Sequence, residues 1–84
     1  MALPCNETFT KPLGSTVPII LEFGGRFPIL SATLAAYGAS KVEDYSLVGT
    51  SVHLIVSGGA GEVVVRASSK VETRIRTAII EEES

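Results

Sequence analysis

The chain has 84 residues, a formal net charge of −2 and a mean hydropathy of +0.37. This length allows one small domain, and the acidic balance argues against a nucleic-acid partner, because contacts to phosphates need a basic patch. No apolar run reaches the ~18 residues of a membrane span, so no membrane partner is expected. The single Cys5 excludes an internal disulfide, and no cluster of metal-ligating residues is apparent. We therefore expect no metal, cofactor or small-molecule substrate.

The first 15 residues show no sustained hydrophobic period and contain Pro4, Pro12 and Gly14. This composition is typical of an extended arm that is ordered only where it meets the body or a partner. We expect an N-terminal arm over residues 1–15 and a single domain over residues 16–84.

Apolar residues alternate with other residues from Val17 to Phe23, as on a β-strand with one buried face. Pro18 has no N–H to donate to a neighbouring strand, which predicts an edge strand. The pair Gly24-Gly25 then ends this strand.

The segment Ile29–Tyr37 is ambiguous between strand and helix. Its alanine and leucine content suits a helix with Ser31 as its cap, but it is short and lies among strands. We predict a strand and keep a one-turn helix over Ser31–Tyr37 as the alternative. A loop over Gly38–Lys41 and a weaker strand over Val42–Val48 are expected to follow.

The C-terminal third alternates clearly and predicts three antiparallel strands, with hairpin turns at residues 57–61 and 68–70. An acidic, solvated tail over residues 81–84 should end the chain. The side chains expected to face the core are Val52, Leu54, Val56, Val63, Val65, Ala67, Val71, Thr73, Ile75, Thr77 and Ile79.

About six short strands separated by glycine and polar turns indicate an all-β fold. We predict a small antiparallel β-sandwich of the immunoglobulin or fibronectin-III type, without the disulfide. A split βαβ fold, with the helix over Ser31–Tyr37, is the alternative.

No catalytic constellation can be assembled from these residues. His53 is the only histidine, and its parity places it on the solvent side of its strand. The loop Gly58–Gly61 leads into a strand rather than a helix, so it predicts a turn and not a phosphate-binding loop. The carboxylates are scattered, and the chain is not expected to be an enzyme.

The strand positions that alternate with the expected core-facing residues hold arginines together with apolar residues. Because a contiguous apolar patch marks an interface, and because arginine provides polar contacts in interfaces, we predict a protein-docking face here. Glu62 and Glu72 should form cross-strand ion pairs with its arginines. The predicted interface residues are Ile20, Ile55, Val64, Arg66, Arg74, Arg76 and Ile80.

The segments Val52–Val63, with its Ser-Gly-Gly-x-x-Gly run, and Val71–Thr77 resemble small tailed-bacteriophage proteins of the fiber-tail adaptor type. The likeness covers about the last forty residues and, loosely, Ile19–Thr33. It departs from that family at Glu22-Phe23, where the family usually has an Asp-Trp pair.

The resemblance implies an immunoglobulin-like sandwich and a non-enzymatic virion protein, made in the host cytoplasm, that links the tail to fibers or to another virion layer. Its partners would be other phage structural proteins in a symmetric, multi-copy assembly. Alternatives are a capsid decoration (cement) protein, a neck protein, or a small ligand-sensing regulatory domain with the split βαβ fold.

Overall fold

The computed structural model describes residues 6–83, which form five β-strands and no helix. The all-β prediction is confirmed, whereas the helix over Ser31–Tyr37 and the split βαβ fold are wrong, because this segment lies within a strand. The strands are β1 (Asn6–Pro12), β2 (Val17–Glu22), β3 (Ser31–Val48), β4 (Ser51–Ser68) and β5 (Thr73–Glu83).

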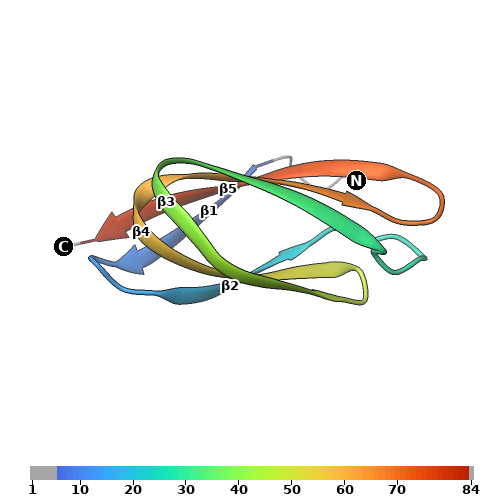
Figure 1. The fold of residues 1–84 in the computed structure, drawn as a ribbon, viewed down its shortest axis with the longest axis horizontal. Coiled ribbons are helices and arrows are strands. Elements are labelled where there is room, and N and C mark those ends of the chain that lie inside the picture. The colour runs from blue at the N-terminus through green and yellow to red at the C-terminus, as the bar shows by residue number, and fades with distance from the viewer. Residues whose placement is uncertain (1–5, 84) are drawn as a thin grey trace.

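Strand β4 is the centre of the sheet, and its two halves have different neighbours. Its first half, from Ser51 to Val56, pairs with β2 on one side and with β3 on the other. Its second half, from Gly61 to Ser68, pairs with β3 and β5, and β1 extends this half by pairing parallel to β5. Figure 1 shows β3 and β4 running together and folding over, so that the sheet curls into two facing halves. This arrangement is sandwich-like.

The fold-over occurs in the middle of two long strands, at what we call the glycine corner (Gly38 on β3 with Gly58, Gly59 and Gly61 on β4). The predicted hairpin turn at residues 57–61 and the predicted loop at residues 38–41 are therefore wrong. Both segments stay paired with each other and lie inside strands of 18 residues. The expected six strands become four by these two mergers, and β1, in the segment expected to be an arm, is the fifth.

The glycines of this corner leave no room for a side chain. A Cβ on Gly58, whose φ is 79°, would lie 2.2 Å from the carbonyl oxygen of Ala39. A Cβ on Gly61 would lie 2.1 Å from the carbonyl oxygen of Tyr37. Close backbone approach of this kind is a known role of glycine within strands.

A register shift at the corner changes which alternate positions of β4 face the core. Between Gly38 and Ser40 of β3, the partner residues run from Gly61 to Gly58, so β4 has one extra residue. Even-numbered residues are buried before the shift and odd-numbered residues after it. The prediction for β4 is thus confirmed on both sides of the corner: the buried residues are Val52, Leu54, Val56, Val63, Val65 and Ala67.

The core lies between the two halves of the curled sheet. Strand β2 contributes Ile19 and Leu21 to it, and Phe23 follows directly after the strand, as the alternation predicted. Among the described strands β2 pairs only with β4, which confirms the predicted edge position. Its Pro18 faces outward, opposite Ile55.

The predicted inward parity of the last strand is wrong. Val71 precedes β5, Ile75 is exposed, and the buried residues of this strand are Arg76, Ala78 and Ile80. The turn over Ser69–Glu72, closed by a 2.9 Å bond from the Ser69 N–H to the Glu72 carbonyl, sets a register in which Arg76 lies opposite the buried Val65. The sequence pattern places Arg76 on the solvent side, because it alternates with apolar residues and because charged side chains are rarely buried without partners.

The described part of the predicted arm is a strand of the sheet. Lys11 of β1 is only 1 % exposed, and its Nζ lies 2.9 Å from a Glu82 carboxylate oxygen and 2.9 Å from the Ser15 carbonyl oxygen. The same Glu82 oxygen accepts a 2.9 Å bond from the Gly14 N–H. Glu82 is therefore part of the structure, not of a solvated tail; residues 1–5 and 84 lie outside the described range.

The glycine corner generates a first prediction. Gly58→Ala should lower the free energy of unfolding by about 3 kcal/mol or more, because it combines a left-handed backbone with a clash against backbone atoms. Gly49→Ala is the matched control, since Gly49 also has a positive φ of 60° but has no atom within 4 Å of the place that a Cβ would occupy. It should cost about 1–2 kcal/mol. Urea denaturation measures both, and equal losses would contradict the steric role of the corner.

Candidate functional site

The seven predicted interface residues do not share one face. Ile20 and Ile55 lie on the outer side of the β2–β4–β3 half of the sheet. Val64 and Arg66 lie on the outer side of the β1–β5–β4 half. Because the inner sides of the two halves pack on a common core, these outer sides face away from each other.

The remaining three predicted interface residues lie inside the molecule or across its open end. Ile80 is buried in the core, and Arg76 is 6 % exposed. The Nη1 group of Arg76 donates a 2.7 Å bond to the Glu22 carbonyl oxygen, and its Nη2 group a 2.9 Å bond to Glu7. Their assignment to a docking face is therefore wrong, because the register of β5 turns both inward.

Arg74 acts beside Arg76 at the same end. Its guanidinium donates to the carbonyl oxygen of Phe23 and pairs with the Glu72 carboxylate. Together the two arginines connect β5 to the end of β2, two strands that belong to opposite halves of the sheet. Glu72 does pair with an arginine, but with Arg74 two residues along the chain at the start of β5. Among residues 6–83 Glu62 forms no ion pair, so the predicted cross-strand pairs are wrong.

The outer side of the β2–β4–β3 half carries an exposed apolar surface, which we call the apolar outer face (Pro18, Ile20, Val48, His53 and Ile55). Side chains from three neighbouring strands align there: Ile20 lies opposite His53, and Pro18 lies opposite Ile55. Ile20 is 53 % exposed, Val48 51 % and Ile55 37 %. His53 is half-buried on this side and points away from the core residues Val52 and Leu54, as predicted.

A pocket of about 270 Å³ opens at the end of the sheet opposite the glycine corner. It lies between the 23–30 loop, which connects β2 to β3, and the 69–72 turn. Its apolar walls are Phe23, Phe27, Ile29 and Val71, and Arg74 is among its polar lining.

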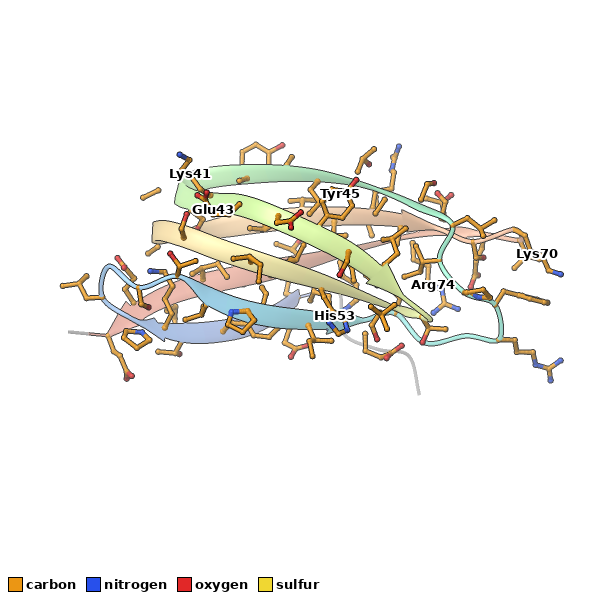
Figure 2. All side chains as sticks on the ribbon, turned by 60° about the horizontal axis from the view of Figure 1, so that its bottom comes forward. Lys41, Glu43, Tyr45, His53, Lys70 and Arg74 are labelled. Carbon is orange, nitrogen blue, oxygen red and sulfur yellow. The ribbon has the colours of Figure 1, made fainter. Side chains whose placement is uncertain are left out.

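Sequence reasoning missed this pocket, because the composition of the 23–30 loop indicates only a break between strands. The signal that could have indicated the pocket is Phe27, a large apolar residue in a glycine- and proline-containing loop. Its ring lies 4.3 Å from the Nζ of Lys70, measured to the ring centroid. Figure 2 shows Lys70 and Arg74 at this end of the molecule, and Lys41 and Glu43 at the other.

Glu22 fixes the base of the 23–30 loop. Its carboxylate accepts hydrogen bonds from the Ser51 hydroxyl at 2.6 Å, from the Thr50 hydroxyl and from the Gly24 N–H at 2.8 Å. These donors, led by Ser51, lower the pKa of Glu22 from 4.5 to about 2. The bonds from Gly14 and Lys11 lower the pKa of Glu82 in the same direction.

The described residues contain no group of three His, Cys, Asp or Glu side chains placed to hold a metal ion. Between residues 6 and 83 there is also no helix with the length and apolar character needed to cross a lipid bilayer. The surface features of this part of the chain that could contact a partner are the apolar outer face and the apolar pocket with cations beside it.

The hydrogen bonds of Glu22 generate a second prediction, on pH. Because its folded-state pKa is depressed to about 2, Glu22 stabilises the fold above pH ~4.5, and this contribution is lost as the pH falls toward 2. Glu22→Gln should be less stable than the parent at pH 7 and should lose less of its melting temperature between pH 5 and pH 2. Glu81→Gln, at an exposed position, is the control and should follow the parent curve. Parallel curves for Glu22→Gln and the parent would contradict the role of these bonds.

No protein-family model, curated protein or solved structure matches this chain. Its function is therefore inferred from the geometry of the two surfaces and from the resemblance of its C-terminal segments.

Proposed function

We propose that this chain is a non-enzymatic structural protein of a tailed-bacteriophage virion, an adaptor that links the tail to fibers or to another virion layer. The observation that carries the proposal is the apolar outer face. On a domain of 84 residues it leaves Ile20, Val48 and Ile55 in contact with water, on three adjacent, paired strands.

The energetics of this face suit a contact that is repeated many times. Full burial of one aliphatic side chain stabilises a complex by about 1.5–3 kcal/mol, and these three side chains are already partly buried. A single contact would thus be weak. In a symmetric, multi-copy assembly the same contact recurs in every subunit, and the resulting avidity makes the attachment stable.

The polar bonds of the fold support the same role, because they make the apolar outer face rigid. Strand β2 is held at its end by Glu22, whose carboxylate binds the β3–β4 turn, and by the arginines of β5. A surface that needs no reorganisation on binding loses less conformational entropy when it docks. Rigid presentation is what an adaptor between two larger bodies requires.

The related roles, a capsid decoration (cement) protein and a neck protein, need the same kind of surface and remain variants of this proposal. The sensing-domain alternative required a helix over Ser31–Tyr37, and that segment is part of β3. The proposed partners are other structural proteins of the phage, and the proposed location is the virion, after synthesis in the host cytoplasm.

The third prediction tests this function in a phage that carries the gene. The parent protein should be present in purified particles in multiple copies, as measured by quantitative mass spectrometry. Ile20→Lys should lower the copy number at least tenfold, because it places an ammonium group in the middle of the apolar outer face.

Ile75→Lys is the matched control, an exposed isoleucine on the opposite outer side of the sheet, and it should be incorporated like the parent. Circular dichroism of both purified variants should show the parent β-spectrum. Absence of the parent protein from particles would reject the virion role; normal incorporation of Ile20→Lys would reject this face as the contact.

A further inference from the structure

The two ends of the molecule differ in shape and charge. The longest dimension is 41 Å. Figure 1 shows the turn between β1 and β2 at one end, next to the last residues of β5 and the glycine corner. The 23–30 loop and the 69–72 turn, which form the pocket, lie at the other end.

The first end presents an apolar tip. Leu13 is 66 % exposed and is held in place by its backbone, whose N–H donates a 3.0 Å bond to the Glu83 carbonyl oxygen. The turn is tightened by Ser15, which donates to the Pro12 carbonyl oxygen from its N–H at 3.1 Å and from its hydroxyl at 2.6 Å. The backbone of Leu13 is therefore held in place, and its side chain is exposed to solvent.

The second end presents a pocket with room for such a side chain. Its volume is about 270 Å³, more than one leucine side chain occupies. Its walls include Phe23 and Phe27, with the exposed Val71 at its edge. An aliphatic side chain from another protein would make apolar contacts with these walls.

The charges of the two ends are complementary. Beside the tip, Glu81 and Glu83 are exposed, whereas Glu82 is neutralised by Lys11. At the pocket end Arg74 pairs with Glu72, and the Glu22 carboxylate accepts hydrogen bonds from Gly24, Thr50 and Ser51, whereas the cations of Arg26 and Lys70 have no carboxylate partner among residues 6–83. Arg26 is exposed and forms no ion pair with any residue between 6 and 83.

We propose that copies of this chain associate head to tail, with Leu13 of one copy inserted into the pocket of the next. Glu83 beside the inserted leucine faces Arg26 and Lys70 of the receiving copy. Because the two contact surfaces are different, every bound copy offers a free tip and a free pocket, and the contact generates a ring or a filament. This extends the proposed structural role by naming a second copy as the partner at the ends.

The size of the contact sets the strength of the association. The dimensions across the long axis are 26 and 17 Å, so an end-to-end contact buries less than the ~800 Å² per partner of a standard stable interface. A pair of free molecules should associate weakly, and neighbours in an assembly should associate firmly because the contact there is one of many. The test must therefore capture the contact by covalent cross-linking, because free molecules should not form a stable dimer.

The experiment uses two purified single-cysteine variants in a Cys5→Ser background: Thr16→Cys, with a thiol on the same turn as Leu13, which stays in place, and Val71→Cys, with a thiol at the pocket. Both positions are exposed, so both variants should fold. A short bismaleimide should cross-link the mixture to a heterodimer at least tenfold faster than it cross-links Thr16→Cys mixed with Ile55→Cys, whose thiol lies on the apolar outer face.

A charge exchange, made in the same Cys5→Ser background, tests the ionic part of the contact. Glu83→Arg on the Thr16→Cys molecule should slow its cross-linking to Val71→Cys severalfold, and Arg26→Glu on the Val71→Cys molecule should restore it. Equal rates for the Val71→Cys and Ile55→Cys mixtures, or full occupation of the pocket by a small carboxylate such as octanoate without effect on cross-linking, would overturn the proposal. Either failure leaves incorporation through the apolar outer face unaffected, because the particle experiment does not depend on the tip or the pocket.

Discussion

The contact that the rest of the structure depends on is the close backbone approach at the glycine corner, where Gly61 lies against the Tyr37 carbonyl and Gly58 against that of Ala39. Two strands of 18 residues can fold over at this point without separating. One hairpin therefore supplies strands to both halves of the sheet. The valines of β4 then meet across a common core, and the short strands β1, β2 and β5 only complete what this hairpin begins.

At the other end, side chains connect β5 to β2, two strands that do not pair with each other within residues 6–83. Arg74 and Arg76 bind the carbonyl oxygens at the end of β2, and Glu22 reinforces the backbone pairing of that end with the β3–β4 turn. Charged groups with several partners are costly to lose, because a buried partner is left without its hydrogen bond. These bonds lie beside both the pocket and the end of the apolar outer face.

The parts of the fold that follow from periodicity could be predicted from the sequence. The inward faces of β2 and of both halves of β4 are examples, because alternation reports burial directly. The glycine corner could not be predicted in this way: a glycine run between two alternating segments has the same composition whether the chain reverses there or bends while staying paired. Whether the chain reverses or stays paired depends on β3, which pairs with this part of β4 but is separated from it in the sequence.

The errors in the candidate site have a similar origin. The charge of Arg76 is visible in the sequence and points to solvent, whereas its partners, Glu22 and Glu7, come from strands far away in the chain. Ile20 and Val64 have the same outward parity but lie on opposite sides of a sheet that folds back on itself. Parity identifies the side of a strand, and only the curl of the sheet decides which outward sides become neighbours.

The pairing of β1 with β5 also has a consequence for the order in which the molecule can form. Lys11 meets Glu82 across 71 residues of sequence, so the first strand of the described chain cannot be placed until the last one has been synthesised. Contacts of such long range slow folding, because the intervening loop must close before they are gained. On the ribosome, the hairpin of β3 and β4 can therefore assemble early, while β1 cannot pair until β5 has been synthesised.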